Sequence, residues 1–130
     1  MADERRRVLL IEDEPNIIEA IRFILSRDGW HVATHSTGRD AVEAVRTRSP
    51  DVVILDVMLP ERSGYDILAD LRAAEATARL PVLMLTARGQ EKERDMALRI
   101  GADKFMTKPF SNAEMLEAVR ALGPAQKKRA

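Results

Sequence analysis

Short apolar runs alternate along this chain with segments in which apolar residues recur every three or four positions. Runs of four to six apolar residues are typical of strands buried on both faces of a parallel sheet. We therefore predict five strands, at residues 7–11, 30–34, 52–56, 81–85 and 104–107. The helical spacing predicts one helix after each strand, at residues 15–28, 37–48, 65–75, 91–100 and 111–122.

The ends of these segments carry local signals that agree with the spacing. Pro15 suits the first turn of the first helix, and Gly29 suits its end. Ser111, with Glu114 three residues later, has the pattern of a capping box at the start of the last helix. Capping preferences and apolar periodicity thus predict the same helices.

The regular alternation of strands and helices predicts an α/β fold. With right-handed crossovers it gives a doubly wound, five-stranded parallel sheet with five helices, flavodoxin-like, in the strand order 2-1-3-4-5. A chain of 130 residues that is 45% hydrophobic fits one domain. We place that domain at residues 5–123 and a flexible basic tail at residues 124–130.

Composition excludes several classes of function. Twenty-one basic residues balance twenty-one acidic residues, so no global charge predicts binding to nucleic acid or to an anionic membrane. The absence of cysteine excludes a disulfide framework and a thiolate metal site. The apolar runs are too short to span a bilayer, and the basic first residues do not resemble a secretion signal. We expect a cytoplasmic protein with no direct nucleic-acid or membrane partner.

Polar residues with compatible chemistry follow four of the predicted strands. Glu12 and Asp13 follow the first strand, and Asp56 ends the third, its neighbour in the predicted sheet. Clustered carboxylates repel one another unless a cation lies among them, and oxygen ligands suit Mg²⁺ or Mn²⁺. Thr86 and Lys108 follow the fourth and fifth strands and provide donors for phosphoryl oxygens. A site for a divalent cation and a phosphoryl group is therefore predicted at this edge.

A simpler interpretation applies to part of this set. Asp13 and Glu14, ahead of Pro15, also suit a helix N-terminus. Asp56 favours the functional interpretation, because a buried strand rarely ends in an acid that lacks a compensating partner.

In the order of these motifs, from about residue 7 to residue 123, the chain resembles the receiver domain of bacterial two-component response regulators, a chemotaxis-regulator-like domain. The resemblance rests on Glu12-Asp13, on Asp56-Val57-Met58-Leu59-Pro60 followed by Gly64, on Thr86-Ala87, and on the run from Gly101 to Phe110.

The resemblance implies a role for each residue of the predicted site. Asp56 would accept a phosphoryl group from a histidine kinase as an acyl phosphate. The metal ion would be held by Asp13, Asp56 and the backbone carbonyl of Met58, with Glu12 acting largely through bound water. Lys108 would pair with a phosphoryl oxygen.

It also implies a switch. Thr86 would move to hydrogen-bond the phosphoryl group, and Phe105, which alone would be read as a core residue, would turn inward with it. The fourth helix, fifth strand and fifth helix would form the output surface. Met58 and Arg88 would border the path of the hydrolytic water and modulate dephosphorylation.

The expected partners are a sensor histidine kinase or phosphotransfer protein, and a downstream output protein or a domain absent from this chain. Lys104 and Ala118 replace an Asp and an Arg that the winged-helix subfamily uses in a salt-bridged homodimer, so we expect a monomer or a weak phosphorylation-dependent dimer. The protein would be a switch that assists its own phosphorylation and dephosphorylation, and not an enzyme.

Three other classes of protein share features with this chain. The acids after the first strand would repel the phosphate of a flavin, which argues against a flavodoxin. Met58 stands where a dehalogenase-type phosphatase has its second acid. The alternative that remains is a pseudo-receiver, a protein-binding module that is never phosphorylated.

Overall fold

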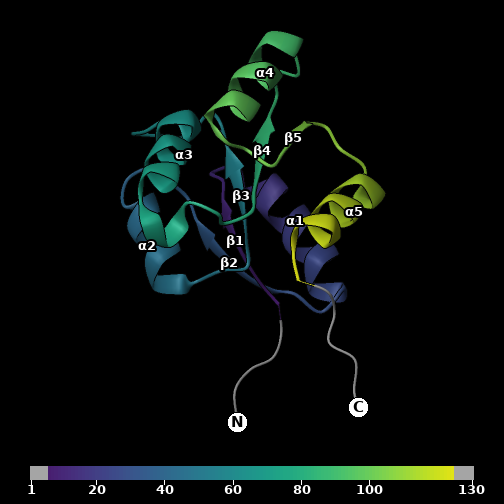
Figure 1. Cartoon of the computed structure of the whole chain (residues 1–130). Helices are drawn as coiled ribbons and strands as arrows, with labels where there is room; N and C mark the ends of the chain where they lie inside the picture. Colours follow the sequence, from purple (N-terminus) through teal and green to yellow (C-terminus); the bar gives the residue numbers. More distant parts are fainter. Residues whose placement is uncertain (1–5, 125–130) are drawn as a thin grey trace.

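Five parallel strands form one sheet in the order β2-β1-β3-β4-β5 in the computed structural model, which describes residues 6–124 (Figure 1). The strands are β1 (Arg7–Ile11), β2 (His31–His35), β3 (Val52–Asp56), β4 (Val82–Thr86) and β5 (Lys104–Thr107). The helices are α1 (Pro15–Arg27), α2 (Ala41–Arg48), α3 (Gly64–Ala73), α4 (Glu91–Ile100) and α5 (Asn112–Leu122), with a 3₁₀ turn, η1 (Glu75–Thr77). The predicted fold class and strand order are confirmed.

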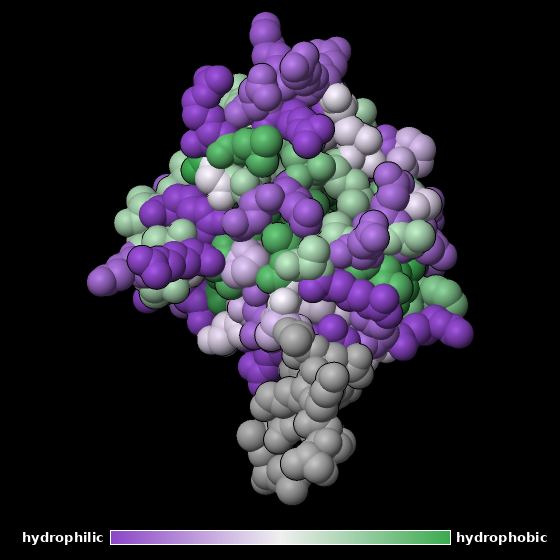
Figure 2. Space-filling model, turned by 45° about the vertical axis from the view of Figure 1, so that its right-hand side comes forward, coloured by the Kyte–Doolittle hydropathy of each residue, from purple (hydrophilic) through white to green (hydrophobic). Residues whose placement is uncertain are grey.

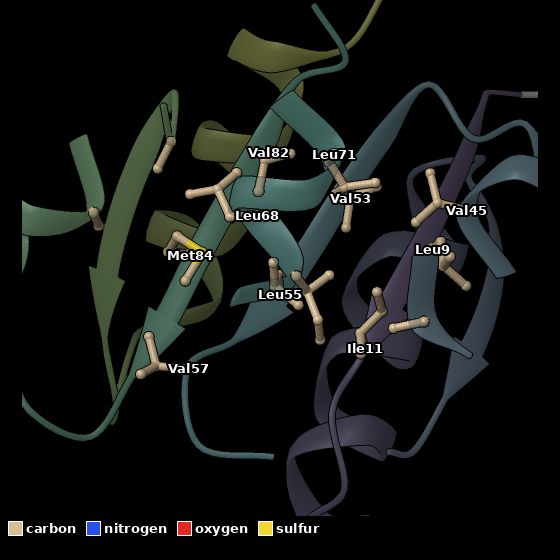
Figure 3. Close-up of a cluster of buried hydrophobic side chains, with 14 residues drawn as sticks. Leu9, Ile11, Val45, Val53, Leu55, Val57, Leu68, Leu71, Val82 and Met84 are labelled. Atoms are coloured by element: carbon tan, nitrogen blue, oxygen red, sulfur yellow. The ribbon is translucent and has the colours of Figure 1, made fainter. Parts of the chain in front are cut away.

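Two hydrophobic cores, one on each face of the sheet, hold the layers together. Side chains alternate along each strand, so Leu9 and Ile11 of β1 face one core while Val8 and Leu10 face the other. Figure 3 shows part of the first core, in which Leu55 and Met84 of the sheet lie close to Leu68 of α3. Because both faces are covered, every side chain of β3 is buried.

The helices divide between these two cores. Buried side chains of α2, α3 and α4 contribute to the first core, and those of α1 and α5 contribute to the second. The two layers of helices bury the central strands β1, β3 and β4 along most of their length. The carboxyl ends of these parallel strands meet at one edge of the sheet. That edge is where a doubly wound sheet binds its ligands.

Several predicted boundaries differ from the structure. The second helix begins at Ala41 and not at residue 37, because Thr37 Oγ1 accepts a hydrogen bond from the Arg39 N–H at 3.0 Å and Asp40 has a φ of 60°. Such local side-chain bonds compete with a helical path. Strands β2 and β4 each lie one residue later than predicted, and α3 ends at Ala73 before η1.

The predicted domain limits stay predictions. Residue 5 and residues 125–130 of the predicted basic tail lie outside the described residues. Within residues 6–124, no helix has the length and apolar character needed to cross a membrane.

Candidate acidic site at the carboxyl edge of the sheet

Three carboxylates converge where β1 and β3 end. Glu12, Asp13 and Asp56 each offer an oxygen that lies within 4.8 Å of the others. The juxtaposition follows from the parallel register, in which Ile11 pairs with Leu55. Glu12 and Asp56 are 0% and 2% exposed, whereas Asp13 is exposed. The cluster is thus buried at its base and open to solvent at Asp13.

The environment of Asp56 favours its protonated form when no metal is bound. The pKa of Asp56 is raised from 3.8 to about 7: burial is the largest cause, the nearby Glu12 carboxylate also raises it, and the Lys108 ammonium acts in the opposite direction. The Met58 N–H donates to Asp56 Oδ1 at 3.2 Å. An added cation near this carboxylate would therefore have a large effect on its charge.

Lys108 provides the positive charge already present at the site. Its Nζ lies 2.7 Å from Glu14 Oε1, 3.1 Å from Glu12 Oε1 and 3.6 Å from Asp56 Oδ2. Burial is the largest single cause and would lower the pKa of Lys108, but the adjacent carboxylates of Glu14, Glu12 and Asp56 together outweigh burial, and the net pKa is raised. The ammonium therefore stays protonated and partly compensates the cluster.

The acidic oxygens fit a hard divalent cation. Glu12 Oε2 accepts hydrogen bonds from the N–H groups of Asp13 and Glu14, both at 3.1 Å. Glu12 Oε1 is buried and faces the Lys108 ammonium at 3.1 Å, in a geometry that makes no hydrogen bond. Mg²⁺ prefers oxygen ligands, and a buried carboxylate oxygen that lacks a hydrogen bond within the described residues and lies close to two other carboxylates meets that preference.

The turn after Asp56 is held tightly against the start of α3. A Cβ on Gly64 would lie 2.2 Å from the Asp56 carbonyl oxygen, so only glycine permits this approach. The Gly64 N–H donates to the Val57 carbonyl at 2.8 Å, which closes the turn. The turn directs the Met58 side chain outward, where it is 65% exposed.

Residues of β4 and β5 complete this edge. Thr86 is buried at the end of β4, and its Oγ1 accepts a hydrogen bond from the Arg88 N–H at 3.1 Å. Phe105 lies on β5 opposite Met84 and packs, partly buried, against the first core. The Arg88 side chain is exposed and points to Glu93, with Nη1 and Oε2 3.6 Å apart.

A family model supplies the decisive comparison. The model of the response regulator receiver domain matches residues 8–120. The chain belongs to this family. The receiver domain is similar over 88% of the chain to the probable transcriptional regulatory protein TcrX of Mycobacterium tuberculosis, with 44% identity over 115 residues. It is 38% identical over 117 residues, 90% of the chain, to the alkaline phosphatase synthesis regulator PhoP of Bacillus subtilis.

The matched part covers 48% of TcrX and 48% of PhoP, so the chain spans about half the length of these curated relatives. Among solved structures, a putative response regulator from Chloroflexus aurantiacus is similar with a TM-score of 0.87 and 28% identity, covering 92% of this chain and 98% of that one. The receiver domain of the sensor histidine kinase PA1611 from Pseudomonas aeruginosa has a TM-score of 0.83 and 29% identity, with 91% and 97% coverage. That structure has a magnesium ion coordinated in its active-site cleft.

The receiver domain also shows a site contact that the sequence interpretation missed. The sequence places Glu14 at a helix start and among the acids that would repel a flavin phosphate, but not in the site, yet it makes the shortest contact to Lys108 Nζ. It is the residue before Pro15 and makes no side-chain cap to α1. Three consecutive acids at residues 12–14 were the available signal, because a helix start alone does not require three.

Proposed function

We propose that this receiver domain is a phosphorylation-activated signalling switch, with Asp56 as the phosphoacceptor. The observation that supports this most directly is the position of the Asp56 carboxylate, between two further carboxylates and the Lys108 ammonium. An oxygen of Asp56 forms a bond to phosphorus while the P–N bond of a donor phosphohistidine breaks. The electron pair of that bond stays on the imidazole nitrogen, and the donor is a sensor histidine kinase or phosphotransfer protein.

The residues of the site position and neutralise charge. Mg²⁺ or Mn²⁺, when bound, supplies the positive charge that phosphoryl transfer between anionic groups requires. We assign Asp13, Asp56 and the backbone carbonyl of Met58 as its ligands, with Glu12 acting through water. Lys108 Nζ, already 3.6 Å from Asp56 Oδ2, pairs with a phosphoryl oxygen.

The switch begins at Thr86. In this structure Thr86 Oγ1 accepts a hydrogen bond, so its own hydroxyl hydrogen is available to donate to a phosphoryl oxygen. Movement of Thr86 toward the phosphoryl group opens space beside β4, into which Phe105 of the neighbouring β5 turns. The phosphoryl group biases this two-state element through its charge.

The output surface comprises α4, β5 and α5. Figure 2 shows the face that carries α5 as hydrophobic patches divided by hydrophilic side chains, with a mostly hydrophilic upper end. Met96 and Leu98 of α4 are among the exposed large hydrophobic residues. Small apolar areas with charged surroundings suit a reversible contact with a downstream output protein or domain.

The competing proposal is a pseudo-receiver that binds proteins without being phosphorylated. Intact and peptide mass spectrometry after incubation with Mg²⁺ and acetyl phosphate separates the two. We expect one phosphoryl adduct, located on Asp56. A protein that remains unmodified, both with acetyl phosphate and with a phosphorylated histidine kinase, would support the binding module.

Mg²⁺ is expected to raise the melting temperature of the wild type and to have much less effect on Asp13→Ala. At a tenfold excess over the dissociation constant, the gain is about 1.4 kcal/mol. The comparison uses thermal melts with and without Mg²⁺, and Asp95→Ala, an exposed acid of α4, serves as control. Equal stabilisation of Asp13→Ala and the wild type would contradict the ligand assignment.

The acyl phosphate is expected to persist for minutes or longer, and Met58→Asn to shorten its lifetime. The exposed thioether of Met58 orients water poorly, whereas an amide both donates and accepts. We expect about tenfold faster loss, equivalent to ~1.4 kcal/mol in the barrier. Phosphate release is followed after removal of the donor, with Met96→Asn as the control for an exposed methionine of α4. Slower loss from Met58→Asn would refute this role.

A further inference from the structure

An arginine-glutamate pair joins the loop after β4 to the first turn of α4. Arg88 Nη1 lies 3.6 Å from Glu93 Oε2, and the two side chains are 72% and 22% exposed. The arginine belongs to the site loop, since its N–H donates to Thr86 Oγ1. The glutamate is fixed in a helix. An ion pair with one highly exposed member contributes little stability, so the pair is easily broken.

Glu93 is the partly buried member of this pair. Its Oε1 is inaccessible to solvent and has no hydrogen-bond partner within residues 6–124. The Glu93 carboxylate also affects Tyr65 of α3. Burial is the main cause of the raised pKa of Tyr65, and the Glu93 carboxylate is the second cause. A carboxylate in such surroundings is stabilised by a cation. Arg88 is the cation within ion-pair distance among the described residues.

The backbone of the loop around Arg88 is in contact with its neighbours, whereas the Arg88 side chain is exposed. A Cβ on Gly89 would lie 2.1 Å from Thr107 Cγ2, so the loop rests directly on β5. The Arg88 N–H is held by Thr86 at the same time. Because the backbone is held at both points, a change of partner by the exposed guanidinium requires only rotation of the side chain.

We infer that Glu93 competes with the phosphoryl group on Asp56 for the Arg88 guanidinium. Glu93 is thus a positioning residue, and this role rests on the proposed phosphorylation of Asp56. A phosphoryl group presents more charge and more acceptor oxygens than a carboxylate, so it attracts the guanidinium when Glu93 does not hold it. Arg88 on the phosphoryl group excludes the hydrolytic water, and Arg88 on Glu93 admits it.

The competition predicts a specific pattern of dephosphorylation rates. Glu93→Gln removes the competing charge with little change in shape, so Arg88 moves to the phosphoryl group and loss of phosphate slows by about threefold, or ~0.7 kcal/mol in the barrier. In an Arg88→Ala background the same substitution should have no effect. The four proteins form a double-mutant cycle, in which a coupling appears only if the two residues act together.

The experiment loads the full chain with acetyl phosphate and Mg²⁺, removes both donor and free phosphate, and follows release of inorganic phosphate. Glu91→Gln, an exposed glutamate of the same helix turn, is the matched control and should match the wild type. Thermal melts of each variant report any loss of fold, including a weaker interaction of Glu93 with the helix dipole.

Each outcome decides a different point. Slower release from Glu93→Gln that disappears in the Arg88→Ala background supports the competition. An equal change with and without Arg88, or no change in either background, overturns it while leaving the proposed function intact. Failure of the wild type to take up any phosphoryl group overturns the proposed function and this inference together.

Discussion

Asp56→Asn is expected to abolish phosphoryl uptake and, without metal, to stabilise the fold. The amide lacks the nucleophilic carboxylate oxygen, so no acyl phosphate forms. The substitution also removes a charge that is 2% exposed and close to the Glu12 carboxylate. The raised pKa of Asp56 means that the folded state disfavours the ionised carboxylate. We therefore expect the free energy of unfolding to increase by an amount on the order of 2 kcal/mol at neutral pH.

The sign of the pH dependence follows from the raised pKa. A carboxyl whose pKa rises from 3.8 to about 7 on folding binds its proton more tightly in the folded state. Its contribution to the free energy of unfolding therefore falls as pH rises from about 4 to about 7 and stays constant above that range. The asparagine amide cannot be protonated or ionised in this range, so the free energy of unfolding of Asp56→Asn lacks this pH-dependent decrease. The stabilising effect should thus be larger at about pH 8 than at about pH 5.

Urea denaturation at these two pH values, without metal, measures the difference directly. Asp95→Asn on the exposed surface of α4 is the control and should change little at either pH. Stoichiometric phosphorylation of Asp56→Asn would refute the phosphoacceptor assignment. An unfolded variant, or one less stable than the wild type at both pH values, would contradict the charge argument.

The sheet was predictable because its central strands, β1, β3 and β4, are buried on both faces. A run such as residues 52–56 has few structural alternatives, and right-handed crossovers restrict the order in which such strands pair. The start of α2 was not predictable from apolar spacing. The Thr37 hydroxyl accepts a hydrogen bond from the Arg39 N–H, and Asp40 adopts a left-handed conformation that the spacing does not encode.

At the site, topology explains what the sequence anticipated. Glu12, Asp13 and Asp56 follow neighbouring parallel strands, so their proximity was a consequence of strand order. The contacts of long side chains were not predictable from the sequence. Lys108 reaching Glu14, like Arg88 reaching Glu93, depends on rotamers that no periodicity specifies.

The carboxylates of the site are compensated by different positive charges in its two states. In the metal-free protein Lys108 is the ammonium that offsets Glu12, Glu14 and Asp56. When a divalent cation and a phosphoryl group are both bound, the added positive and negative charges fall among the same side chains. The ammonium is then available to the phosphoryl oxygens, because the cation takes over part of its role toward the carboxylates.

Lys108→Ala is expected to slow phosphorylation by at least tenfold and to destabilise the metal-free protein. Loss of the ammonium removes a preorganised positive charge from the transferring group, and a tenfold effect requires only about 1.4 kcal/mol. It also leaves the buried carboxylates of Glu12 and Asp56 without their counter-charge. Removal of one partner from a buried ion pair lowers the free energy of unfolding by about 2 kcal/mol or more.

The two effects respond differently to Mg²⁺, which makes the prediction specific. The cation should stabilise Lys108→Ala more than it stabilises the wild type, because it replaces the missing positive charge near the carboxylates. It should not restore the rate, since the phosphoryl oxygens still lack their ammonium donor. Thermal melts and acetyl phosphate time courses with and without Mg²⁺ measure both effects, and Lys92→Ala on the exposed side of α4 is the control. Phosphorylation of Lys108→Ala at the wild-type rate would remove Lys108 from the mechanism, because the reaction would then proceed without the one ammonium placed beside Asp56 in the described structure.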